Sequence, residues 1–162
     1  MIKGTVEKAI NEQINAELYS AYLYLSMSAY FEDQNLPGFA HWMSLQAKEE
    51  QEHAMKFYRF VFERGGRVTL AAIDAPQTEW KSPLDVFESA YKHELKVTAL
   101  IHDLVALSRS EKDFATENFL MWYVDEQVEE EAHADAIVQK LKRIKDSING
   151  MFMLDRELSG RE

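Results

Sequence analysis

Apolar residues along this chain recur in steps of three and four, which is the spacing of an α-helix with one buried face. The pattern predicts a first helix over about residues 5–33, with Thr5 as its N-cap, and a second helix that ends near Arg64. Between them, residues 33–38 contain a proline, a glycine and the candidate cap Asn35, which indicates a tight turn. This part of the chain is therefore expected to form an antiparallel helical hairpin.

Residues 65–82 lack helical spacing and contain two glycines and a proline, so they are expected to form an extended connection. Eighteen extended residues can span roughly 60 Å, which is enough to cross a bundle of long helices from end to end. A third helix opens at Ser82-Pro83, a cap followed by proline at the first helical position. A fourth helix follows a break at 108–113 and is predicted to end at Asn149-Gly150.

The four long helices predict an all-α fold, with residues 1–146 forming one bundle. Residues 147–162 are expected to form a short C-terminal helix and tail. The apolar segment 151–158 is too brief to be a stable helix unless it docks on the bundle.

The predicted buried face of each long helix carries polar residues where a core would require apolar ones. These residues are Glu17 in the first helix, Glu50 and His53 in the second, Glu94 in the third, and Gln127 and Glu130 in the fourth. Glu50 and His53 stand three apart, so they share one helix face and can bind one metal ion. Each position lies about 16 to 19 residues from its turn, so antiparallel pairing brings all six to one level.

An internal repeat supports this arrangement. An offset of 77 residues carries Glu17 onto Glu94, Glu50 onto Gln127 and His53 onto Glu130, together with neighbouring apolar positions. One helical hairpin is thus present twice, and the fold expected from the repeat is two antiparallel hairpins joined by a long crossover.

Four buried carboxylates need a counter-charge, because bare anions lose several kcal/mol of hydration and repel one another. Glu17, Glu50, Glu94 and Glu130 carry four negative charges, and the predicted buried faces offer no Lys or Arg near the same level. Two divalent cations would balance them. Oxygen-rich ligation with one imidazole favours iron or manganese over structural zinc, and two such metals can activate dioxygen or peroxide.

Composition narrows the function further. The formal net charge of −10 argues against nucleic acid or an anionic membrane as a partner. The absence of cysteine excludes disulfides, thiolate zinc sites and rubredoxin-type iron sites. No run approaches a membrane span and the first ten residues do not have the pattern of a secretory signal, so we expect a cytoplasmic protein.

Five segments carry a resemblance to a known family. They are Glu-Leu-Tyr-Ser at 17–20, Gly-Phe-Ala-His-Trp-Met at 38–43, Lys-His-Glu at 92–94, Trp-Tyr-Val-Asp-Glu-Gln-Val-Glu-Glu-Glu at 122–131 and Leu-Asp-Arg-Glu-Leu at 154–158. Through them the chain resembles the bacterial and archaeal non-haem ferritins from end to end. The four-helix carboxylate bundle is the known architecture of ferritin-like di-iron proteins.

The resemblance implies a set of site residues. Glu17, Glu50 and His53 would bind one iron, and Glu50, Glu94 and Glu130 the other, with Gln127 against the pair. Glu49, Glu126 and Glu129 match a third iron site that shares Glu130, and Tyr24 matches a tyrosine beside the centre. The implied activity is ferroxidation of Fe(II) by dioxygen or hydrogen peroxide. The ferric mineral would be stored inside a shell of twenty-four subunits.

Several alternatives stay open on sequence alone. Glu130 and His133 also form Glu-x-x-His, as in haem-containing bacterioferritins, whereas Gln51 stands at their haem-ligating Met position, so haem is not expected. Solvated helix charge competes with the third-site assignment, and Tyr24 could be a core aromatic residue. A di-iron or di-manganese peroxidase or catalase without storage is the second function class, and a purely structural bundle is the third.

Overall fold

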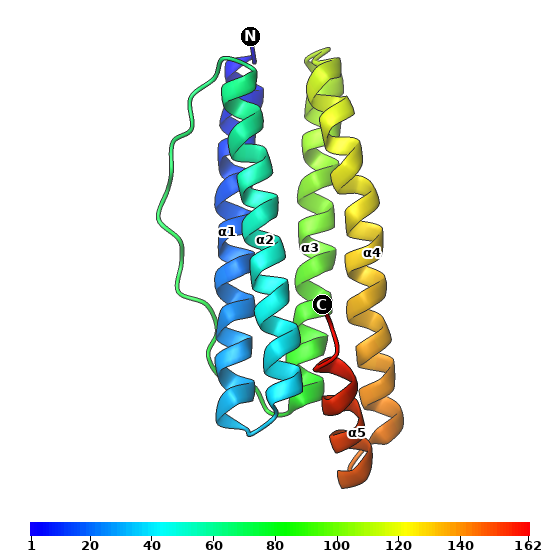
Figure 1. Cartoon of the computed structure of the whole chain (residues 1–162). Coiled ribbons are helices and arrows are strands. Elements are labelled where there is room, and N and C mark those ends of the chain that lie inside the picture. Colours follow the sequence, from blue (N-terminus) through cyan, green and yellow to red (C-terminus); the bar gives the residue numbers. More distant parts are fainter.

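The computed structural model describes all residues 1–162 and contains five helices and no strand. The helices are α1 (Gly4–Asp33), α2 (Pro37–Glu63), α3 (Pro83–Ser110), α4 (Phe114–Ile144) and α5 (Ile148–Leu158). Figure 1 shows α1 with α2 and α3 with α4 as two antiparallel hairpins, with α5 at the end of the bundle. The all-α fold, the paired hairpins and the short fifth helix predicted from the sequence are confirmed. None of the five helices has the length and apolar content needed to span a bilayer.

The start of α3 follows the sequence signal closely. Ser82 Oγ accepts a hydrogen bond from the backbone N–H of Asp85 at 3.1 Å, and Pro83 occupies the first helical position. Asp113 caps α4 in the same way, accepting from the backbone N–H of Thr116 at 3.2 Å. Such local bonds satisfy N–H groups that the first turn of a helix leaves free.

Two other caps were predicted wrongly. The N-cap of α1 is Lys3 rather than Thr5, and its side chain makes no capping bond. Asn35 lies in the turn with a positive φ of 56°, and α2 begins after Leu36, whose apolar side chain cannot cap it. Asn35 therefore supplies a left-handed turn residue, which asparagine tolerates better than most residues.

The predicted end of the fourth helix was also wrong. α4 stops at Ile144, where Lys145 adopts a φ of 48°, and Asn149 and Gly150 belong to α5. A Cβ atom on Gly150 would lie 2.9 Å from the Cβ atom of Ile144. The glycine thus allows the first turn of α5 to pack closely on the end of α4, rather than terminating a helix.

The connection between α2 and α3 runs along the outside of the bundle (Figure 1) and forms no β-structure at 67–70. Side chains of α1 hold its backbone. Asn11 accepts from Thr69 N at 2.7 Å and donates to Arg67 O at 3.0 Å, and Asn15 donates to Ala72 O at 3.0 Å. Asn11 and Asn15 lie on one helix face, so they satisfy polar groups of an extended segment that has no strand partner.

Two apolar clusters fill the bundle, one on each side of the polar residues. In α1, Ile14 belongs to one cluster and Leu23 to the other, with Glu17 between them. In α3, Ala90 and Val97 flank Glu94 in the same way. The polar side chains therefore form a layer between two packed apolar regions, which fix the helix positions around it.

Helix α5 docks through a cap that it supplies to another helix. Asp155 Oδ1 accepts hydrogen bonds from the backbone N–H groups of Gly38 at 2.8 Å and Phe39 at 3.0 Å, at the first turn of α2. A Cβ atom on Gly38 would lie 1.7 Å from the carbonyl oxygen of Asp155. Glycine at position 38 is therefore required for this approach, and a carboxylate there also suits the helix dipole.

We expect Gly38→Ala to displace α5 and lower the melting temperature, because the added methyl overlaps the α5 backbone. The loss should be roughly 1–3 kcal/mol, as for other overpacked contacts. Thermal unfolding followed by circular dichroism would measure it. Gly4→Ala is the matched control, since no atom lies within 4 Å of the corresponding Cβ position. Equal melting temperatures for both variants would contradict the proposed docking contact.

Candidate metal centre

The four long helices bring the six polar residues of their buried faces together. Glu17 comes from α1, Glu50 and His53 from α2, Glu94 from α3, and Gln127 and Glu130 from α4. All six are buried, and none is more than 6 % exposed. Side chains more than 100 residues apart in the sequence thus meet in one closed layer.

Ligand atoms in this layer fall into two buried groups. Atoms of Glu17, Glu50 and His53 lie within 4.8 Å of one another, and so do atoms of Glu50, Glu94 and Glu130. Glu50 belongs to both groups, so its carboxylate lies between them. Two cations bridged by a shared carboxylate would fit this geometry.

Neutral amides and one phenol orient the carboxylates. Gln13 Nε2 donates to Glu17 Oε1 at 2.8 Å, Gln127 Nε2 to Glu94 Oε2 at 3.1 Å, and Gln46 Nε2 to Glu130 Oε2 at 2.6 Å. Each donor uses one lone pair of a carboxylate oxygen and leaves the remaining lone pairs for a metal, in the way that outer hydrogen bonds orient metal ligands.

Tyr24 lies in the same layer. Its hydroxyl donates to Glu94 Oε1, and the ring is buried in the core. Burial first, and then the charge of Glu94, raises the pKa of Tyr24 well above its ordinary value. The phenol therefore stays protonated and can hold Glu94 through its donated hydrogen bond.

Gln13 and Gln46 were not assigned a role from the sequence. A signal for both was present, because each stands four residues before a glutamate on the same buried face, at 13/17 and 46/50. Gln46 also reaches across the bundle to α4, which no spacing within one helix could indicate.

The carboxylates lack basic partners. No Lys or Arg forms an ion pair with Glu17, Glu50, Glu94 or Glu130, and Glu17 Oε2 has no hydrogen-bond partner although it is fully buried. Burial first, and then the charge of Glu50, raises the pKa of Glu17 to about 8. Burial and the neighbouring Glu94 raise the pKa of Glu130 to about 7.

These shifts are the electrostatic signature of a site that requires a cation. A buried anion next to other anions retains its proton unless a positive charge replaces it. The free oxygen of Glu17 and the oxygen-rich donor set therefore fit hard divalent metals.

The residues assigned to a third position are placed differently from one another. His53, Glu126 and Glu130 form a further group of ligand atoms within 4.8 Å, and Glu126 Oε1 lies 3.7 Å from His53 Nε2. Glu49 is half-buried and paired with Arg161, whereas Glu129 is exposed. Of the three flanking glutamates, only Glu126 is brought into a ligand group.

Two residues of the bacterioferritin alternative lie at the surface. His133 and Gln51 are both exposed, so His133 does not join Glu130 in the buried layer. The repeat-based choice of Gln127 and Glu130 agrees with this placement.

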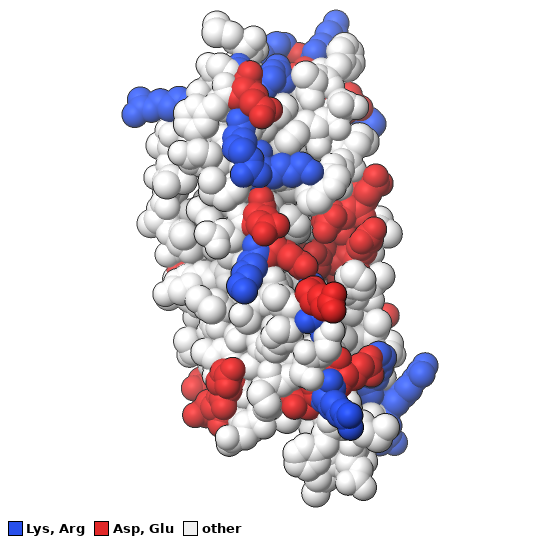
Figure 2. Space-filling model, in the orientation of Figure 1, with Lys and Arg blue, Asp and Glu red and all other residues white.

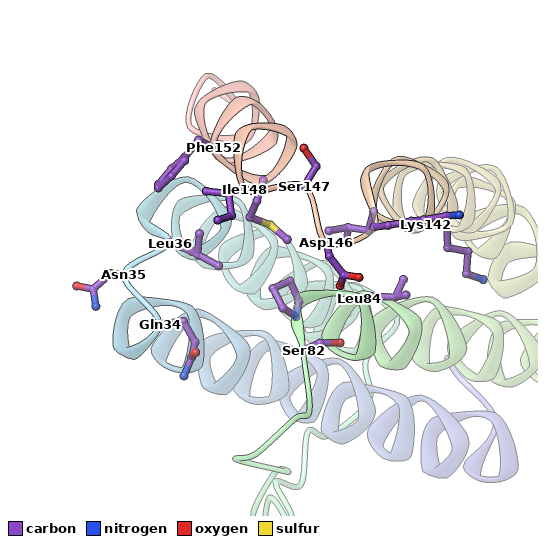
Figure 3. A pocket seen from close by; sticks show the side chains of 14 residues that line it. Gln34, Asn35, Leu36, Ser82, Leu84, Lys142, Asp146, Ser147, Ile148 and Phe152 are labelled. Atoms are coloured by element: carbon purple, nitrogen blue, oxygen red, sulfur yellow. The ribbon is translucent and has the colours of Figure 1, made fainter.

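A cavity of about 720 Å³ lies at one end of the bundle, between the α1–α2 turn, the start of α3, the end of α4 and α5. Figure 3 shows Leu36, Leu84 and Ile148 among the side chains that line it. No residue of the carboxylate layer lines this cavity.

A family model described as the Ferritin-like domain matches residues 7–144, which is most of the chain and covers the four long helices except the first three residues of α1. The chain belongs to the ferritin family.

Known ferritins match over nearly full length. A bacterial non-haem ferritin of Bacteroides fragilis is 47 % identical over 99 % of this chain and 100 % of its own length. A probable bacterial non-haem ferritin-like protein of Haemophilus influenzae is 40 % identical, over 98 % of this chain and 96 % of its own. Among solved structures, an open-pore ferritin of the archaeon Archaeoglobus fulgidus has a TM-score of 0.99 and 55 % identity. That match covers 99 % of this chain and 98 % of the solved one.

We expect the stability of the metal-free ferritin to reveal the raised pKa of Glu17. Between the ordinary pKa of 4.5 and the folded value of about 8, the folded state holds a proton that the unfolded state releases. This carboxyl therefore makes the free energy of unfolding fall with rising pH, by roughly 1.4 kcal/mol per unit. In Glu17→Gln this loss is absent. The melting temperature of the variant, relative to that of the wild type, should therefore rise between pH 5 and pH 8.

Calorimetry of metal-free wild type and variant at several pH values would test this expectation. Glu52→Gln changes an exposed carboxyl of α2, so the difference between its melting temperature and that of the wild type should stay constant across the pH range. A constant difference between Glu17→Gln and wild type would show that Glu17 is ionised in the folded protein.

Proposed function

We propose that this ferritin is a ferroxidase that stores the oxidised iron as a ferric oxyhydroxide mineral. Iron storage is the function that membership of the ferritin family supports. The observation that carries the ferroxidase assignment is the pair of buried ligand groups that share Glu50. They offer two adjacent cation positions in a layer with no other counter-charge.

In the proposed reaction, Glu17, Glu50 and His53 bind one Fe(II), and Glu50, Glu94 and Glu130 bind the second. Each Fe(II) gives one electron, so two Fe(II) and two protons reduce one dioxygen to hydrogen peroxide, or one hydrogen peroxide to two water molecules. Anionic oxygen ligands stabilise Fe(III) more than Fe(II), so the protein favours the oxidised product. Water then hydrolyses the ferric product to oxyhydroxide and protons are released.

The remaining assigned residues would act around this pair. Gln127 and Tyr24 hold Glu94 by donating hydrogen bonds to its two oxygens. Glu126 and Glu130 would provide ligands for an outer iron position. Glu49 and Glu129 stay predicted contributors to that position. The proposed cofactor set contains iron and no haem.

Storage requires a container, and we expect this ferritin to assemble into a hollow shell of twenty-four subunits. Exposed apolar side chains on α5 support self-association, because Ile148, Phe152 and Met153 are each more than 60 % exposed in the single chain. The division into a bundle at 1–146 and a docked helix with tail at 147–162 agrees with this role of α5. The cytoplasmic location stays a prediction.

We expect Glu50→Ala and His53→Ala to fold and assemble normally but to lose rapid Fe(II) oxidation, at least about tenfold in initial rate. Glu50→Ala should have the larger effect, because it removes a ligand from both positions. Stopped-flow absorbance of ferric product formation would measure the rates. Glu52→Ala, an exposed change on the same helix, is the matched control. Wild-type rates in Glu50→Ala would overturn the site assignment.

Storage itself is tested by titrating the metal-free protein with Fe(II) under anaerobic conditions, then admitting oxygen while light scattering monitors particle size. Twenty-four chains of 18.8 kDa predict a particle of about 450 kDa. We expect two or three irons per chain before oxidation and a soluble ferric core of many irons per chain after it. Two irons per chain in a small oligomer without a core would indicate a di-iron peroxidase or catalase instead.

A further inference from the structure

The segment after α5 turns back along α2 toward the metal centre. Figure 1 shows the C-terminal end beside the bundle rather than beyond its end. Arg161 anchors this tail, because its carbonyl oxygen lies 2.7 Å from His41 Nε2 and its Nη1 donates to Trp42 O at 3.2 Å. Its guanidinium also lies 4.4 Å from the centre of the Trp42 ring, a cation–π contact.

The same guanidinium reaches two polar side chains of α2. Nη1 donates to Gln46 Oε1 at 2.9 Å, and Nη2 forms an ion pair with Glu49 Oε2. The Arg161 side chain is only 19 % exposed, so these bonds are partly shielded from water. A planar guanidinium held by several acceptors and a ring is more fixed than an ordinary surface ion pair.

Gln46 connects this contact to the metal ligands. A guanidinium can only donate, so the amide oxygen of Gln46 must face Arg161 and its nitrogen must face the carboxylates. That nitrogen donates to Glu130 Oε2 at 2.6 Å and lies 3.4 Å from Glu50 Oε1. A continuous chain of hydrogen bonds therefore connects Arg161 in the tail, through Gln46, to the proposed metal ligand Glu130.

The same contacts link Glu49 to the centre. Glu49 precedes the shared ligand Glu50, and the guanidinium that holds it also binds Gln46, whose amide nitrogen donates to Glu130. Glu130 in turn belongs to the group with His53 and Glu126, beside the two inner positions. Released from Arg161, Glu49 would be free to offer its carboxylate to a cation held there.

We propose that Arg161 is a positioning residue that keeps this outer cation position closed by holding Glu49. A cation at the outer position competes with the guanidinium for the same carboxylate. The inner positions contain no built-in positive charge and bind metal without such competition. The inference rests on the proposed function, because it presupposes that Glu17, Glu50, His53, Glu94 and Glu130 bind two cations.

The test is a Zn(II) titration of the metal-free, assembled protein by calorimetry, which needs no oxidation step. In Arg161→Ala, the two tight sites per chain should remain, because Arg161 bonds none of their ligands directly. The affinity of a weaker outer site should rise about tenfold. In Arg161→Lys the positive charge remains, so the outer affinity should stay within about twofold of the wild type. The double variant Arg161→Ala with Glu49→Gln should lose the gain.

Arg156→Ala is the matched control, because it removes an exposed basic residue of the last turn of α5. An unchanged or weaker outer site in Arg161→Ala, or a gain that survives Glu49→Gln, would overturn the role of Arg161. Loss of the two tight sites in the wild type itself would instead refute the proposed function. Size-exclusion chromatography of each variant would verify that the assembly is intact.

Discussion

Burial of four carboxylates without a basic partner is the constraint on which this structure depends. Glu17, Glu50, Glu94 and Glu130 lie in one layer, and their raised pKa values follow from burial and mutual repulsion. Without support from the rest of the fold, such a layer would open to water, or its carboxylates would become protonated. The apolar clusters on both sides prevent opening, since each of the four helices is packed above and below the layer. The stability of the bundle thus maintains a charge arrangement that is unfavourable until cations bind.

The internal repeat explains how one chain builds such a layer and why its two halves differ. Each hairpin provides one acid from its first helix and a pair at i, i+3 from its second. In the first hairpin that pair is Glu50 and His53, and in the second it is Gln127 and Glu130. An amide in place of a carboxylate removes one charge, and the amide nitrogen of Gln127 donates to Glu94. The shared carboxylate therefore comes from α2 alone, which makes the two cation positions chemically unequal.

The layer could be predicted because its signal is periodic. Six polar residues on apolar faces, repeated at a fixed offset, specify which side chains meet without any knowledge of loop structure. The helix ends that were predicted wrongly have no such periodic signal in the sequence. The cap of α2 comes from Asp155, more than 100 residues away, and Gly150 is explained by a close contact with Ile144. Such features depend on tertiary packing, so no local cap or stop pattern around Asn35 or Gly150 could indicate them.

Arg161 is another long-range feature of this kind. It gives one of the carboxylates near the centre, Glu49, a basic partner. Glutamates at 49 and 50 are neighbours in the sequence, yet one faces a guanidinium and the other faces only anions, amides and an imidazole. Since a fixed internal cation satisfies Glu49, metal binding there must displace an existing partner, whereas binding at Glu50 relieves repulsion. If cations bind as proposed, binding is therefore more favourable at the inner positions for electrostatic reasons. We then expect the inner positions to fill before the outer one, because the chain has placed its own positive charge beside Glu49.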